Sequence, residues 1–129
     1  MAANVLIIES EPWLGDHYQQ TMERHGYAVM RATDGHSAID MIDDNPPQAI
    51  IMSVLLHGPS AFALLHELQS YIDTAGIPVI MCSSLSGLVL DDLRPYGVQR
   101  LLDSSSMQPQ DLVAAVRSVN IKIDEDDSE

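Results

Sequence analysis

Five residues that carry a carboxylate or a hydroxyl stand at the ends of short apolar runs. Glu9 and Ser10 follow VLII, Ser53 and Ser83 follow AIIM and IPVIMC, and Ser104 follows QRLLD. A serine hydroxyl attacks a phosphoryl or acyl group near neutral pH only when a base lies beside it. No His, Lys or second acid is placed to serve as that base at Ser53, so we predict no catalytic residue and no enzymatic activity.

Metal binding at Glu9 is the second function that the sequence could suggest. A hard cation such as Mg²⁺ needs several oxygen ligands, and Glu9 with Glu11 supplies too few carboxylates. The five histidines share no ligand spacing on one helix face. Cys82 is the only cysteine, which excludes an internal disulfide and a cysteine-clustered zinc site. We predict neither a metal nor another cofactor.

Strand-like and helical segments alternate along the chain and must position these residues. Apolar runs of strand type are separated by longer segments in which apolar residues recur with helical period. A proline or glycine near the ends of several helical segments marks their boundaries. The predicted strands cover residues 5–8, 27–32, 49–54, 77–82 and 99–102, and the predicted helices cover 12–25, 38–42, 62–75, 88–93 and 112–119.

Continuous apolar strands between amphipathic helices predict an α/β fold with a doubly wound, five-stranded parallel sheet. In such sheets the functional crevice lies beyond the carboxyl ends of the strands, which is where the five polar residues stand. Beyond Lys122 the segment DEDDSE is too charged to pack. We therefore predict one domain over residues 1–121 and a disordered acidic tail or linker over residues 122–129.

The segments VLIIESEP, HGYAVMRATDGHSAIDMI, AIIMSVLLHGPSAFALL, IPVIMCSS and GVQRLL occur in an order that resembles the receiver domain of two-component response regulators. The resemblance covers roughly residues 4–120. It implies a flavodoxin-like sheet with strand order 2-1-3-4-5, which the alternation of strands and helices also favours.

A working receiver carries an acidic pair that holds Mg²⁺, an aspartate that accepts the phosphoryl group, a hydroxyl and a lysine. Carried onto this sequence, the pair becomes Glu9 and Ser10, the aspartate becomes Ser53, the hydroxyl becomes Ser83, and the lysine becomes Ser104. The resemblance therefore implies a pseudo-receiver with a degenerate phosphorylation pocket. Ser105 also replaces a proline, so we predict a trans bond between Ser104 and Ser105.

Several pocket residues allow two interpretations. Glu9 either replaces the charge of the phosphorylated state, with hydrogen bonds from Ser53, Ser83 or Ser104, or is a half-exposed acid at a strand end, which we favour. Ser53 is either a substrate of a serine kinase or a small residue in place of an aspartate, and we favour the second. The serines at 104–106 form either a phosphate-binding nest or polar loop filling, which we again favour.

A candidate interface lies on the segment GLVLDDL and the elements that follow it. A surface helix buries only one stripe, so at least one of three consecutive apolar residues should face outward. In receivers this region forms the face used for dimers and partners, and mixed charges around apolar groups are typical of protein interfaces. The predicted interface residues are Leu88, Val89, Leu90, Asp91, Arg94, Arg100, Asp111 and Arg117.

Composition limits the classes of partner. Nineteen acidic and six basic residues give a net charge of -13, which repels nucleic acids and anionic membranes. No apolar stretch reaches membrane-spanning length, so we predict a cytoplasmic protein without membrane insertion.

The leading hypothesis is a phosphorylation-independent interaction module of bacterial signalling that docks to a protein partner or to a second copy of itself. Two alternatives stay open: an atypical receiver that is phosphorylated at a non-standard residue, and the regulatory head of a longer response regulator.

Overall fold

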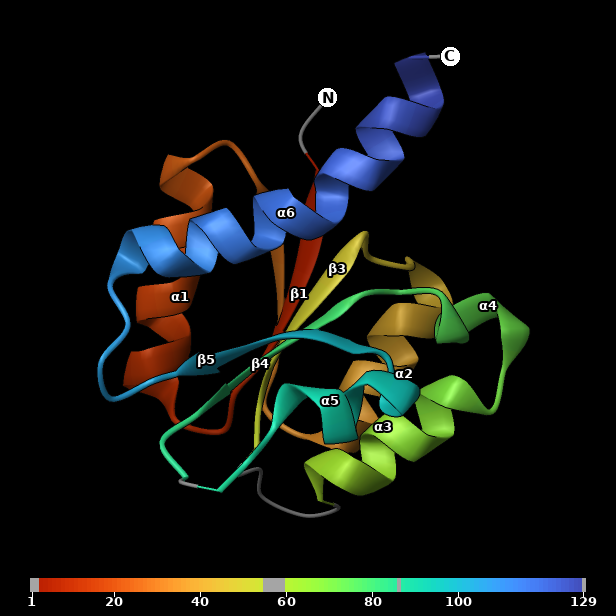
Figure 1. Ribbon diagram of the computed structural model, residues 1–129, viewed down its shortest axis with the longest axis horizontal. Coiled ribbons are helices and arrows are strands. Elements are labelled where there is room, and N and C mark those ends of the chain that lie inside the picture. Colours follow the sequence, from red (N-terminus) through yellow and green to blue (C-terminus); the bar gives the residue numbers. More distant parts are fainter. Residues whose placement is uncertain (1–2, 55–59, 86, 129) are drawn as a thin grey trace.

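The computed structural model describes residues 3–54, 60–85 and 87–128 of the chain (Figure 1). Strands and helices alternate through this part, as the sequence predicts. The elements are β1 (Asn4–Ile8), α1 (Pro12–Arg24), β2 (Ala28–Ala32), α2 (Gly35–Asp44), β3 (Ala49–Ser53), α3 (Ala61–Gln69), α4 (Ile72–Ala75), β4 (Val79–Ser83), α5 (Leu90–Leu93), the 3₁₀ turn η1 (Arg94–Tyr96), β5 (Val98–Asp103) and α6 (Pro109–Ser128).

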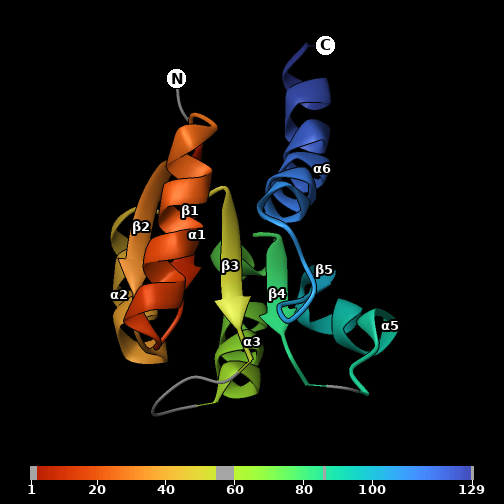
Figure 2. The same cartoon turned by 90° about the vertical axis from the view of Figure 1, so that its left-hand side faces the viewer.

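The strands form one parallel sheet in the order β2-β1-β3-β4-β5. The predicted doubly wound, flavodoxin-like sheet is confirmed, and the arrows of β2, β3 and β4 point the same way in Figure 2. The register places Ser53 opposite Cys82 and Ser83 opposite Asp103. Because all five strands run in one direction, their carboxyl ends meet at a single edge of the sheet.

Two apolar cores lie on opposite faces of the sheet. Val5 and Ile7 pack on one face with residues of α1 and α6, whereas Leu6 and Ile8 pack on the other face with residues of α2, α3 and α5. This alternation follows from the two-residue period of a strand. Helices therefore cover both faces, and the edge formed by the strand ends is left to the loops.

Local signals fix where several helices begin. Pro12 occupies the first turn of α1, where the missing N–H costs nothing. The Asp34 carboxylate accepts a hydrogen bond from the N–H of Ser37 at 2.8 Å, and the Ser60 hydroxyl accepts one from the N–H of Ala63 at 3.1 Å. These caps satisfy backbone donors that have no partner within α2 and α3.

The predicted helix over 62–75 is two helices, α3 and α4. The Ser70 hydroxyl donates to the carbonyl oxygen of His66 at 2.9 Å, and the Thr74 hydroxyl donates to that of Leu68 at 2.5 Å. Hydroxyls that bond to nearby backbone oxygens compete with helical hydrogen bonds, which explains the break. The predicted helix over 88–93 is also shorter, because α5 begins at Leu90.

Helix α6 continues into the acidic segment that we expected to be disordered. It runs to Ser128, and its last turns extend beyond the edge of the sheet in Figures 1 and 2. No Gly or Pro follows Pro109 to end the helix, and that is the physical reason for the difference. Within the described ranges, no helix combines the length and apolar character that a membrane crossing requires.

Candidate functional site

Glu9 lies at the carboxyl edge of the sheet, directly after β1, with only 2% of its surface exposed. Its carboxylate accepts a hydrogen bond from the N–H of Glu11 at 3.0 Å, and its own N–H donates to the carbonyl oxygen of Ala32. The prediction of a half-exposed acid is therefore wrong: the side chain is buried at the edge, where its carboxylate is held by the N–H of Glu11 two residues on. The hydrogen bond found at the carboxylate comes from the backbone rather than from the serines of the pocket.

Three predicted pocket serines lie on the same edge as Glu9. Ser10 is buried, and its hydroxyl donates to the carbonyl oxygen of Thr33 at 2.7 Å. Ser53 is the half-buried last residue of β3. Ser83 is buried at the end of β4, and its hydroxyl accepts a hydrogen bond from the N–H of Leu85 at 2.9 Å. The fold thus brings the predicted residues to one edge, with Ser10 and Ser83 hydrogen-bonded to backbone.

Asp103 organises the loop after β5. Its carboxylate accepts hydrogen bonds from the Ser105 hydroxyl at 2.6 Å and the Ser105 N–H at 2.9 Å, and these bonds hold the pKa of Asp103 below its ordinary value of 3.8. Its carbonyl oxygen accepts from the N–H groups of Ser106 and Met107. The donors of a phosphate-binding nest are therefore already used within the loop.

Ser104 joins this loop to β4. It is half-buried, and its N–H donates to the carbonyl oxygen of Ser83 at 3.0 Å. The described peptide bonds are all trans, so the predicted trans bond between Ser104 and Ser105 is confirmed. The two residues carried over to the hydroxyl and lysine positions of a receiver are thus neighbours in space.

Two buried side chains near Glu9 were missed from the sequence. Tyr18 of α1 and Cys82 of β4 lie in the core below the edge. Burial raises the pKa of the Cys82 thiol to about 12, and the negative charge of the Glu9 carboxylate raises it further. The thiol is therefore protonated near neutral pH and is no nucleophile. Successive side chains of a strand point to opposite faces of the sheet, so the position of Cys82 directly after Met81 could have predicted that these two residues belong to different cores.

The residues at this edge do not fit the Mg²⁺ site that a receiver implies. Glu9 is the one buried carboxylate at the edge among the residues that the structure describes. The Ser10 hydroxyl donates to a backbone oxygen, and β3 ends in a serine. The described parts of the chain hold no group of three or more His, Cys, Asp or Glu placed to bind a metal ion. Mg²⁺ needs more anionic oxygens than this arrangement supplies.

The predicted interface residues of the α5 segment differ in exposure. Leu88 and Leu90 are half-buried against the core, whereas 52% of the Val89 surface is exposed. Asp91 and Arg94 form an exposed ion pair at 3.3 Å. Val89 is therefore the outward residue of the three, and the sequence missed two further exposed apolar side chains nearby in the chain, Leu85 and Tyr96.

A groove of about 450 Å³ lies between β5 and α6. Arg100 and Asp111 line it from the two sides, together with Leu101 and Met107. The Asp111 carboxylate also accepts a hydrogen bond from the N–H of Gln108 at 2.8 Å. Arg117 is exposed on α6 but does not line the groove. Arg100 and Asp111 thus line the same groove, and Arg117 lies outside it.

Comparisons with known proteins agree with this architecture. The family model of the response regulator receiver domain matches residues 5–117. PilH of Pseudomonas aeruginosa is 24% identical over 82 residues, which are 64% of this chain and 68% of PilH. The phosphate regulon transcriptional regulatory protein PhoB of Escherichia coli is 25% identical over 95% of this chain and 54% of PhoB. This chain therefore spans about half the length of PhoB.

A solved structure gives the same fold. The receiver domain of a signal transduction histidine kinase from Syntrophus aciditrophicus superposes with a TM-score of 0.80 at 26% identity, over 92% of this chain and 89% of that one.

Proposed function

This chain belongs to the response regulator receiver domain family, and we propose that it is an interaction module whose binding does not depend on aspartyl phosphorylation. The observation that carries the proposal is the residue at the end of β3. A receiver forms an acyl phosphate on a carboxylate, whereas β3 ends in Ser53. The buried carboxylate of the edge, Glu9, follows β1 and accepts a hydrogen bond from its own loop.

The remaining hydroxyls also lack what a nucleophile needs. Serine attacks a phosphoryl group only when a base removes its proton, and the nearby Cys82 thiol and Tyr18 hydroxyl both have raised pKa values. Neither group is a charged base near neutral pH. Transfer of a phosphoryl group from phosphohistidine to a serine at this edge is therefore disfavoured, because the receiver itself would have to supply the base. A fixed surface is the better basis for function.

We assign binding to the surface formed by α5, η1, β5 and the start of α6. Val89 is exposed beside the Asp91–Arg94 ion pair, and Arg100 and Asp111 line the groove between β5 and α6. An exposed apolar residue surrounded by charges of both signs is typical of protein interfaces. The occupant is a protein partner or a second copy of the chain.

Two substitutions of similarly exposed apolar residues test this surface. Val89→Asp places a charge at its centre, whereas Phe62→Asp changes a residue on α3 that is 42% exposed. We expect Val89→Asp to weaken self-association or partner capture by about 1–3 kcal/mol, and Phe62→Asp to leave it intact. Sedimentation and quantitative capture measure both variants after circular dichroism has established folding. Unchanged binding of Val89→Asp together with loss in Glu9→Gln would place the working surface at the edge instead.

The match to PhoB supports a second candidate function. PhoB is named as a transcriptional regulatory protein, and this chain matches about half of its length. In that case the chain is the regulatory part of a longer regulator. The complete reading frame in the source genome distinguishes the two candidates, because only the second requires an output domain.

A further inference from the structure

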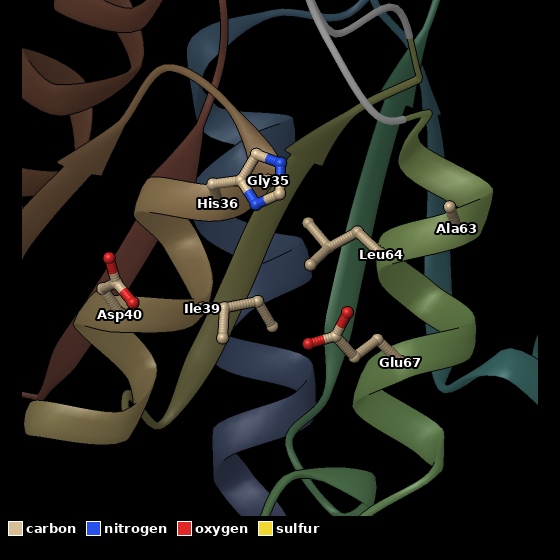
Figure 3. A pocket seen from close by; sticks show the side chains of 7 residues that line it. All are labelled: Gly35, His36, Ile39, Asp40, Ala63, Leu64 and Glu67. Atoms are coloured by element: carbon tan, nitrogen blue, oxygen red, sulfur yellow. The ribbon is translucent and has the colours of Figure 1, made fainter.

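Helices α2 and α3 enclose a groove on the sheet face opposite α6. Its first part, about 190 Å³, lies between Gly35 and Leu64 (Figure 3). A second part of about 300 Å³ continues to Tyr71 on the connection to α4, and both parts share Ile39 and Glu67. The groove is therefore continuous along the two helices.

The floor of the groove is apolar. Leu64 and Leu68 are buried beneath it and Ile39 is half-buried, and in Figure 3 Ile39 and Leu64 point into the space between the helices. At the far end Tyr71 is exposed, and 96% of the surface of Ile72 is exposed beside it. An apolar strip that continues from a groove onto an exposed helix is a feature of docking sites.

The rim of the groove is acidic. Asp40, Asp43, Glu67 and Asp73 line it, and Figure 3 places Glu67 on the groove side of α3. Helices α2, α3 and α4 contain no Lys or Arg. The ion pairs found in the described residues are Arg31–Asp16 and Arg94–Asp91, so none of these four carboxylates takes part in one. His36 also lines the groove, at its Gly35 end.

We propose that this groove binds a basic amphipathic helix of a partner protein, with apolar side chains on the floor and Lys or Arg at the rim. Such a helix complements both the charge and the apolar strip. A second copy of the chain fits this acidic rim poorly, because the rim requires a basic helix and the chain has only six basic residues against nineteen acidic ones. The two cavities lie at or below the lower end of small-molecule sites, about 300–1,000 Å³, so they suit single side chains.

This surface is separate from the one assigned to the proposed function. It is built from α2, α3 and α4, whereas the proposed docking surface is built from α5, β5 and α6. A substitution that disrupts one surface leaves the other unchanged. Each proposal is therefore tested by variants that do not affect the other.

A synthetic peptide of leucine and lysine arranged in helical period serves as the probe, and a scrambled peptide of the same composition serves as its control. Titration of the isotope-labelled chain should shift amide resonances of α2, α3 and α4. Glu67→Lys should weaken binding about tenfold, because it reverses a rim charge. Asp92→Lys makes the same charge change on α5 and should weaken binding about twofold or less.

A second variant tests the apolar floor. Ile39→Ala removes part of the floor without changing charge and should weaken binding several-fold in a folded chain. The proposal is overturned by any of four results: no saturable binding, equal binding of the scrambled peptide, equal loss in Glu67→Lys and Asp92→Lys, or shifts centred on α5 and β5.

Discussion

At the scale of single residues, hydrogen bonds within the loops organise the carboxyl edge of the sheet. The Glu9 carboxylate accepts a hydrogen bond from the N–H of Glu11, and the Ser10 hydroxyl donates one to the carbonyl oxygen of Thr33. The Asp103 carboxylate accepts hydrogen bonds from the N–H and the hydroxyl of Ser105. These polar groups fix the loops around the edge, and that is a structural use of positions that a phosphorylated receiver uses for chemistry.

Asp103 makes the pH dependence of this arrangement measurable. Its pKa is lowered in the folded chain by the Ser105 hydrogen bonds, so the carboxylate stabilises the fold above its ordinary pKa of 3.8. That contribution is lost as the pH falls through the lowered folded-state pKa. Asp103→Ala should therefore be less stable than the parent near neutral pH, and the difference should close in acid.

Urea denaturation across this pH range measures the difference in unfolding free energy. Asp92→Ala is the control, because Asp92 is exposed and its carboxylate accepts no hydrogen bond from the described residues. If Asp103→Ala stays less stable than the parent by the same free energy below the folded-state pKa of Asp103, the charge of Asp103 is not what stabilises the loop.

The sequence predicted which residues reach the edge but not how deeply Glu9 is buried. Strand ends can be located from apolar runs, because each run has a defined length and direction. Burial of a strand-end side chain depends on loops that come from distant segments. The Ser10 to Thr33 hydrogen bond joins residues 23 positions apart, a contact that no local pattern reveals.

At the scale of elements, α6 has a packed part and an extended part. Leu112, Val113, Val116 and Val119 are buried against the sheet. Beyond them the helix extends past the edge of the sheet in Figures 1 and 2. Among the residues whose side chains are described, α6 contributes to the core through this packed part.

A chain that ends at Ile121 should fold with nearly the stability of the full chain. The buried residues of α6 end at Val119 in the part whose side chains are described, and the removed segment is strongly acidic. Removing like charges also reduces self-repulsion. Urea denaturation should give midpoints that differ by little. A large loss of stability would mean that residues 122–129 belong to the domain, against the boundary that we propose.

The lengths of the elements were harder to predict than their order. The helical period continued through Ile72, but hydroxyl groups of Ser70 and Thr74 bond to backbone oxygens and divide the segment. The acidic residues after Lys122 suggested disorder, yet nothing in that segment stops α6. Propensity and charge are weak guides where a helix is already nucleated by a packed turn.

At the scale of the whole molecule, the parallel direction of the sheet followed from the alternation of apolar runs and amphipathic segments, and the resemblance to receivers implied the strand order. Right-handed crossovers leave few ways to close five such units, and the observed order is one of them. The positions of the two candidate binding surfaces could not be predicted in this way. The α2–α3 groove depends on side chains from two helices that are distant in sequence, and no local pattern shows that they meet.

The central claim is that the carboxyl edge of this receiver does not take up a phosphoryl group on an aspartate. Beryllofluoride with Mg²⁺ imitates that group, and amide resonances near Ser53, Ser83 and Ser104 report its binding. A variant with Ser10→Asp, Ser53→Asp and Ser104→Lys restores the receiver residues on the same fold and is the matched control.

The most direct test is the titration of both chains with beryllofluoride and Mg²⁺. We predict that the unaltered chain shows no saturable shifts around these serines and that the restored variant does, because only the variant has the carboxylates and the lysine that the complex needs. Saturable shifts around Ser53 in the unaltered chain would contradict the account and favour an atypical receiver that still undergoes phosphotransfer.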